Sequence, residues 1–137
     1  MATTIARDVE LGPRAAAIAR SAIELVEQEL PPALVEDLKL LVSELVTNSY
    51  RHAGLGLGAT ARLIVEIDNG YVRVDVEDPG RGFVPGVPAE EPRDRSSGWG
   101  LTIVDRVADR WGVTRDGHTH VWFELATDAA HPAARSA

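Results

Sequence analysis

The dipeptide Asn69-Gly70 constrains the fold of this 137-residue chain more than any other short segment. It lies between two runs of alternating apolar and polar residues, which is the strongest local signal for a β-hairpin. With these residues as the turn, the register pairs Glu66 with Arg73, and opposite charges across a ladder support that register. The other face of the hairpin is then wholly aliphatic and consists of Leu63, Val65, Ile67, Val72, Val74 and Val76.

Asp78 interrupts this aliphatic face at the end of the second strand. The register sets it opposite Ala61, on the side of the sheet that a core must cover. A tight turn over residues 79–83 explains the glycines there, but it does not explain a carboxylate on an apolar face. An ionised carboxylate beneath a pocket can accept a hydrogen bond from an exocyclic amine. Asp78 is therefore a candidate ligand-binding residue.

Two amphipathic helices are predicted before the hairpin, after a short edge strand over residues 3–10. Apolar residues three and four positions apart predict the first helix over about 13–29, with a stripe of Ala15, Ile18, Ala19, Ala22, Leu25 and Val26. Pro31-Pro32 ends this helix. The second helix extends to about Arg51, and its apolar face consists of Leu34, Leu38, Leu41, Val42 and Leu45.

Residues 79–98 follow the hairpin and are rich in proline, glycine and charge, without periodicity. A structureless connection longer than about 12 residues is usually a functional lid or a disordered segment. A short helix over about 100–109 comes next, followed by a second hairpin with strands at 111–115 and 118–125 around Asp116-Gly117. The expected inner face of that hairpin consists of Thr119, Val121, Phe123 and Leu125.

These elements predict an α/β two-layer sandwich of the α+β class, in which three helices cover one face of a mixed, mostly antiparallel sheet. The chain is long enough for one core, and 45% hydrophobic and 26% charged residues are typical of a globular protein. We expect one domain over residues 3–125. The patternless segment over residues 126–137 is expected to be a disordered tail.

Composition excludes several classes of function. With 21 acidic and 14 basic residues, the net charge of −7 argues against binding to nucleic acid or anionic lipid. The chain has no cysteine, which excludes disulfides, thiolate nucleophiles and Cys-type zinc sites. Lys39 is the only lysine, and no Walker motif is present, which argues against P-loop and Schiff-base enzymes. Without a secretion signal or an apolar span, the expected compartment is the cytoplasm.

Polar side chains interrupt the second helix near its end. Glu44 and Asn48 are four residues apart and so lie on one face of the helix. A solvated polar face is the alternative interpretation. However, the run Thr47–Tyr50 forms helices poorly and adjoins the strongest apolar stripe in the chain, which indicates that these groups are kept for chemistry.

Two further patterns have competing interpretations. Ser96–Gly100 leads into a helix, where free backbone N–H groups favour a phosphate, although an ordinary serine cap is the alternative. This segment is a poor fit to a dinucleotide-binding motif, because the third glycine is missing. His118 and His120 could bind a metal, but no third ligand is near them in the sequence. We therefore expect exposed strand histidines there.

Three motifs, in chain order, carry a resemblance to a known family. Glu44–Asn48, Asp78–Phe83 and Gly98–Leu101 resemble the N, G1 and G2 boxes of the GHKL ATPases, whose ATP-binding domain has the Bergerat fold. The resemblance is closest to the small stand-alone branch, the anti-sigma-factor serine/threonine kinases of bacteria. It covers about residues 3–125. Three boxes in the correct order and spacing are far more specific than any one of them.

The resemblance implies a role for each matched position. Asp78 would bind the adenine amino group with Thr119 assisting through water, Asn48 would hold Mg²⁺ at the phosphates, and Glu44 would be the general base. Residues 84–97 would form the ATP lid. The remaining nucleotide-binding positions would be Gly80, Gly82, Ser97, Gly98, Gly100 and Leu101.

The function that the resemblance implies is an ATP-dependent and Mg²⁺-dependent serine/threonine kinase. Its implied substrate is an anti-anti-sigma protein of the STAS type, and its second implied partner is a sigma factor. Two alternatives stay open: a non-catalytic binding switch that depends on ATP, and an ATPase or chaperone-like module. The sequence leaves homodimer formation undecided.

Overall fold

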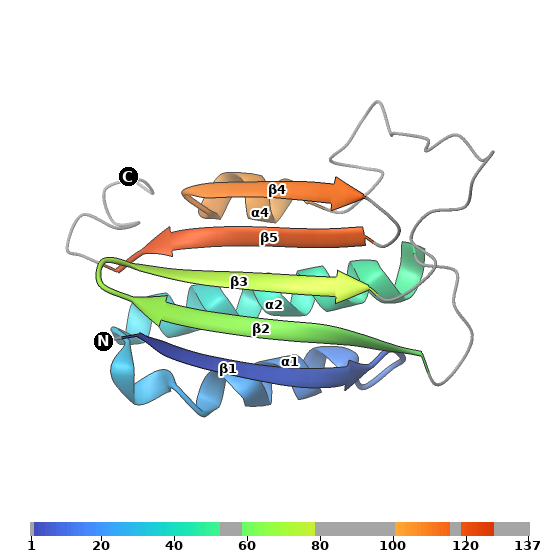
Figure 1. Ribbon diagram of the computed structural model, residues 1–137, viewed down its shortest axis with the longest axis horizontal. Helices are drawn as coiled ribbons and strands as arrows, with labels where there is room; N and C mark the ends of the chain where they lie inside the picture. Colours follow the sequence, from blue (N-terminus) through green and yellow to red (C-terminus); the bar gives the residue numbers. More distant parts are fainter. Residues whose placement is uncertain (1, 53–58, 79–100, 116–118, 128–137) are drawn as a thin grey trace.

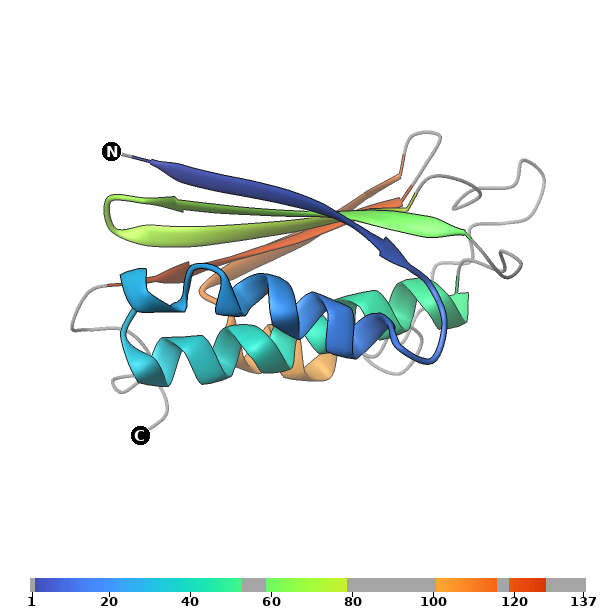
Figure 2. The same cartoon turned by 90° about the horizontal axis from the view of Figure 1, so that it is seen from below.

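The computed structural model describes residues 2–52, 59–78, 101–115 and 119–127, which form a sheet with helices on one side (Figures 1 and 2). The strands are β1 (Thr3–Glu10), β2 (Thr60–Asp68), β3 (Tyr71–Asp78), β4 (Arg110–Arg115) and β5 (Thr119–Ala126). The helices are α1 (Ala15–Glu24), α2 (Pro32–His52) and α4 (Thr102–Val107), with a 3₁₀ turn at Glu27–Glu29. The predicted two-layer α/β fold is confirmed.

The sheet has the strand order β1-β2-β3-β5-β4, and each pairing between these described strands is antiparallel. The expected mixed character is therefore wrong for this part of the chain. The first hairpin has the predicted register, with Glu66 opposite Arg73. Gly70 has a φ of 91°, a backbone conformation that glycine adopts without strain, which explains the Asn-Gly turn.

The register of the second hairpin is not the one that a two-residue turn at Asp116-Gly117 would give. Arg115 lies opposite Thr119, so three residues, 116–118, separate the paired positions. The turn itself and His118 lie outside the described residues. The inner face of β5 is nevertheless as expected, because Val121, Phe123 and Leu125 are all buried.

The first helix is shorter than its periodicity predicts. After Glu24 the chain tightens, with Leu25 N–H donating to the carbonyl of Ala22 and Val26 N–H to that of Ile23. This i→i+3 pattern rotates Leu25 out of the buried stripe, and its side chain is 65% exposed. The prediction of a helix to residue 29 with Leu25 inside was therefore wrong.

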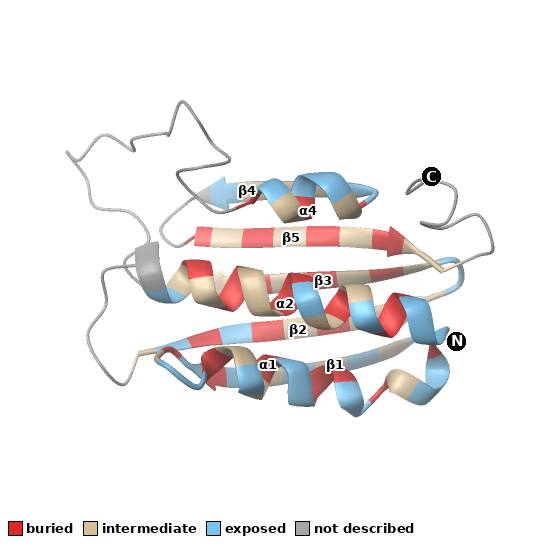
Figure 3. Cartoon of the chain, turned by 180° about the vertical axis from the view of Figure 1, so that it is seen from behind, coloured by how far each residue is buried: buried red, intermediate tan, exposed pale blue. Residues whose placement is uncertain are grey.

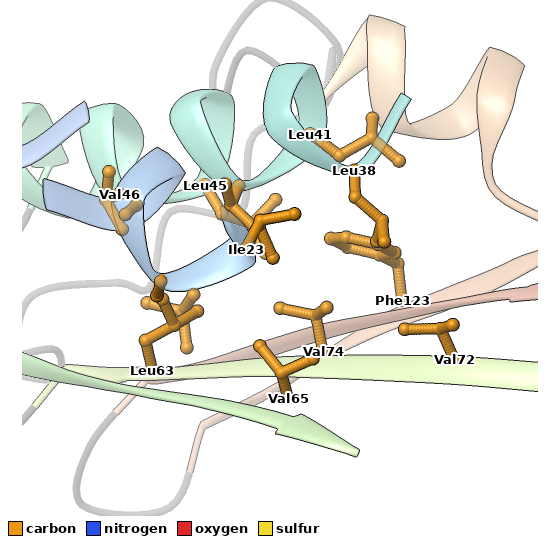
Figure 4. Close-up of a cluster of buried hydrophobic side chains, with 14 of the residues drawn as sticks. Ile23, Leu38, Leu41, Leu45, Val46, Leu63, Val65, Val72, Val74 and Phe123 are labelled. Carbon is orange, nitrogen blue, oxygen red and sulfur yellow. The ribbon is translucent and has the colours of Figure 1, made fainter. Parts of the chain in front are cut away.

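The core lies between α1 and α2 on one side and the inner face of the sheet on the other (Figures 3 and 4). All five predicted apolar residues of α2 are buried, and α2 ends at His52, close to the expected Arg51. Helix α4 is shorter than the expected 100–109 and buries Val104. Among the described residues, no helix combines the length and apolarity needed to cross a membrane.

Candidate functional site

Two neighbouring strands each change from apolar to polar at the same end of their inner face. On β3 the buried positions are Val72, Val74, Val76 and then Asp78, and on β5 their direct partners are Leu125, Phe123, Val121 and Thr119. Asp78 is 3% exposed and Thr119 is 6% exposed. The predicted position of Asp78 on the core face is thus confirmed, and Thr119 lies directly opposite it.

Helix α2 contacts β3 and adds a third polar group in the same way. Its buried stripe continues through Leu45 to Asn48. The C-terminal part of α2 lies near the end of the sheet where β3 finishes and β5 begins (Figure 1). Asn48 is 5% exposed, and its side-chain Nδ2 has no hydrogen-bond partner within the described structure. A buried unpaired amide costs about 1–3 kcal/mol, so this group is suited to an external acceptor.

Glu44 lies one helical turn before Asn48 and is only half-buried. The four-residue spacing puts the two side chains about 40° apart around the α2 axis. Asn48 is therefore enclosed while Glu44 is accessible from outside.

Leu101 is the remaining predicted site residue that the structure describes. It caps the N-terminus of α4 and is 3% exposed, so its side chain belongs to the core. The other predicted nucleotide-binding positions and the lid lie outside the described residues: Gly80, Gly82, Ser97, Gly98, Gly100 and residues 84–97.

His120 differs from the expectation of an exposed strand histidine. Its Nε2 atom is buried and lies 3.3 Å from Asp75 Oδ1, on the face of the sheet opposite the helices. Within the described ranges, no group of three or more His, Cys, Asp or Glu residues could hold a metal ion. The sequence carried no signal for this contact, because it depends on the pairing of β3 with β5, which sets His120 opposite Glu77, two residues from Asp75.

Comparison with known proteins identifies the family of this chain. The model of the histidine kinase-like ATPase domain matches residues 8–125, so the chain belongs to that family. Membership confirms the GHKL resemblance and implies an ATP-binding domain.

Two curated proteins are similar in sequence. The anti-sigma F factor of Pasteuria penetrans is 35% identical over 104 residues, which cover 69% of this chain and 69% of that protein. An uncharacterized protein of Streptomyces coelicolor is 38% identical over 76 residues, covering 56% of this chain and 71% of that protein. The match to an anti-sigma factor supports the predicted branch of the family.

A solved structure has the same fold. The structure of the RsbU and RsbW domains of a Mycobacterium tuberculosis protein superposes with a TM-score of 0.63 at 18% identity. The match covers 89% of this chain but only 32% of that longer chain. It supports the two-layer fold described above.

Proposed function

We propose that this protein is an anti-sigma-type regulator that binds Mg²⁺-ATP where α2 and β3 end and β5 begins, and that it phosphorylates an anti-anti-sigma partner of the STAS type. The proposal depends mainly on one observation. Asp78 and Asn48 are each at most 5% exposed, at a point where the inner faces of the sheet and of α2 change from apolar to polar. The Nδ2 atom of Asn48 also has no hydrogen-bond partner within the described structure, and such a group destabilises a core unless it binds something.

The residues suit an adenine nucleotide. The carboxylate of Asp78 accepts hydrogen bonds, so it selects a base with an exocyclic amine, and the hydroxyl of Thr119 can hold a bridging water. The next inward-facing residues on the same two strands, Val76 and Val121, are apolar and buried, so Asp78 and Thr119 lie at the boundary of the core. Asp78 and Thr119, which lie opposite each other on β3 and β5, would therefore recognise the adenine edge.

Asn48 suits the phosphate end of the nucleotide. Mg²⁺ prefers oxygen ligands and usually keeps several waters, so one carboxamide oxygen together with phosphate oxygens forms a sufficient set. When bound, Mg²⁺-ATP would supply the transferable γ-phosphoryl group and neutralise its charge. The unpaired Nδ2–H of Asn48 is available to a phosphate oxygen.

In this proposal Glu44 acts as the general base. Its carboxylate would accept the proton of a serine or threonine hydroxyl while the oxygen of that hydroxyl forms a bond to the γ-phosphorus. The bond from that phosphorus to the β–γ bridging oxygen breaks, and ADP leaves. The accessibility of Glu44 supports a protein substrate that reaches the site from solvent.

The similarity to an anti-sigma F factor supports the partner class of the proposal. In this interpretation a sigma factor and the unphosphorylated STAS-type protein compete for the chain. We place its action in the cytoplasm, where both partners would be found.

The decisive experiment compares Glu44→Gln with the wild type in phosphate transfer from radiolabelled ATP to a cognate STAS-type protein. Glutamine keeps the size of the side chain but cannot accept a proton, so transfer should fall by a factor of about 10² to 10⁴ while ATP affinity is retained. Glu36→Gln is the matched control, because Glu36 is an exposed residue two turns earlier on α2. It should transfer phosphate at the wild-type rate.

Two outcomes would revise the proposal. Full transfer by Glu44→Gln would reject the catalytic role of this residue. A wild type that binds Mg²⁺-ATP and the cognate partner without any transfer would favour a non-catalytic switch that depends on nucleotide.

A further inference from the structure

The outer face of the sheet, which is the side without helices, carries a connected group of side chains behind the candidate site. We refer to Arg73, Asp75, Arg110, His120, Trp122 and Glu124 as the outer-face cluster. Arg73 is at its centre. Its Nε atom donates to both carboxylate oxygens of Asp75, at 3.0 and 3.2 Å, and its Nη1 atom donates to Glu124 at 3.1 Å.

Arg73 holds the carboxylate of Asp75 in place. The guanidinium carbon lies 4.3 Å from the centre of the Trp122 ring, a cation–π contact that restricts the arginine further. Burial by itself would lower the pKa of Arg73, but hydrogen bonds and charge from Asp75 and Glu124 outweigh burial and raise the pKa above its usual value. The carboxylate of Asp75 is thus held in one orientation from one side.

His120 contacts the carboxylate of Asp75 from the other side. Its buried Nε2 atom lies 3.3 Å from Asp75 Oδ1, a close polar contact, although the geometry is not that of a hydrogen bond. Glu77, its cross-strand partner, and Thr114 of β4 are the register positions beside it. The contact therefore joins the beginning of β5 to the middle of β3.

This connection lies directly behind the candidate site. Thr119 is the first residue of β5 and Asp78 is the last residue of β3, and strand ends open more easily than strand centres. Thr119 and His120 are adjacent, so their side chains point to opposite faces of the sheet. A contact that fixes His120 on the outer face also limits movement of Thr119 on the inner face.

We propose that His120 is a positioning residue for the nucleotide site, and that its contact with Asp75 keeps Thr119 in register with Asp78 so that the pair presents a preformed adenine-binding edge. The inference rests on the proposed function. Neither His120 nor Asp75 would touch the nucleotide. Their effect is on the affinity for the base, because a preformed edge loses less entropy on binding.

The test measures the affinity for ATP and for adenosine by calorimetry, at a temperature where circular dichroism confirms that each variant is folded. His120→Ala should bind both ligands about fivefold to tenfold more weakly. Asp75→Asn keeps the size of the side chain and should give a similar loss. The double variant should be no weaker than the weaker single variant, because both changes break the same contact.

Val72→Ala is the control for general destabilisation. Val72 is fully buried at the far end of β3, and truncating it leaves both the outer-face cluster and the site intact. This variant should lose thermal stability but keep the wild-type affinity for both ligands. A merely structural role of His120 would instead make affinity follow stability across all the variants.

The outcomes separate this inference from the proposed function. A wild type that binds neither ATP nor adenosine contradicts the proposed function, and the inference fails with it. Binding by the wild type together with equal binding by His120→Ala contradicts the inference alone. A loss of affinity in Val72→Ala equal to that in His120→Ala also contradicts it.

Discussion

Three polar side chains at the candidate site are almost completely buried. Asn48, Asp78 and Thr119 are 5%, 3% and 6% exposed, respectively. Of the three, Asp78 is the one whose charge is most costly to bury, since an ionised carboxylate loses more hydration than an amide or a hydroxyl. Its replacement by a neutral isostere is therefore the most sensitive test of ligand binding at the level of a single residue.

Asp78→Asn should weaken ATP binding by about tenfold or more. The variant keeps the shape of the side chain but loses the ionised acceptor, and a hydrogen bond to a charged group is worth about 1.5–3 kcal/mol. Calorimetric titration with Mg²⁺-ATP measures the effect. Asp8→Asn is the control, because Asp8 is an exposed residue on β1 that pairs with Arg62 at 3.7 Å, away from the site. Unchanged affinity in Asp78→Asn would contradict the role of this residue in recognising the base.

At the scale of the elements, side-chain parity made much of this arrangement predictable. The Asn69-Gly70 turn determines which residues of β3 face the core, and the same alternation leads directly to Asp78. Helical spacing likewise identified Asn48 beside the buried stripe of α2. Both predictions depend only on the period of a regular element, which a single sequence contains.

The features that were missed depend on contacts between elements. The α1 helix ends early through i→i+3 bonds that its periodicity does not encode. The outer-face cluster joins residues of β3, β4 and β5, so it becomes visible only once the strand order is known. The register of the second hairpin depends on the length of its turn, which the Asp-Gly pair did not determine.

Gly112 on β4 illustrates such a contact and provides a second prediction. A Cβ atom at this position would lie 2.9 Å from two atoms of the Trp122 ring. The guanidinium group of Arg73 stacks over this ring and restricts its movement. Gly112→Ala should therefore destabilise the protein by about 1–2 kcal/mol, since overpacking outweighs the backbone advantage of alanine over glycine in a strand. The loss should appear as a Tm lower by roughly 3–6 °C.

Two further variants check the cause of that loss. Gly12→Ala should leave the Tm unchanged or slightly raised, because no atom lies within 4 Å of the added Cβ. Truncation of the tryptophan in Gly112→Ala/Trp122→Ala should remove the clash, so the added cost of the glycine change should vanish in that background. A Gly112→Ala variant as stable as the wild type would show that the ring can move aside.

At the scale of the whole molecule, the site lies at one end of a single core, so ligand binding and folding are linked. The buried polar groups there belong to α2, β3 and β5, the elements that also supply most of the large buried side chains (Figure 4). A nucleotide that binds only the folded chain stabilises it by RT ln(1 + [L]/Kd), which is about 2.7 kcal/mol when the ligand is at 100 times its Kd. For a domain of this size such a gain is worth roughly 10 °C in Tm.

The last prediction uses this linkage to test the place of Mg²⁺. Saturating Mg²⁺-ATP should raise the Tm of the wild type by roughly 10 °C, and chelation of Mg²⁺ by EDTA should remove most of that rise. In Asn48→Ala the rise should be small with or without the metal, because the carboxamide that would coordinate Mg²⁺ is gone. Adenosine should instead stabilise both proteins equally, since it reaches Asp78 without a phosphate or a metal. Differential scanning fluorimetry of the two proteins with each ligand measures all of these shifts. An Asn48→Ala variant that retained the full Mg²⁺-dependent rise would assign the metal to other residues.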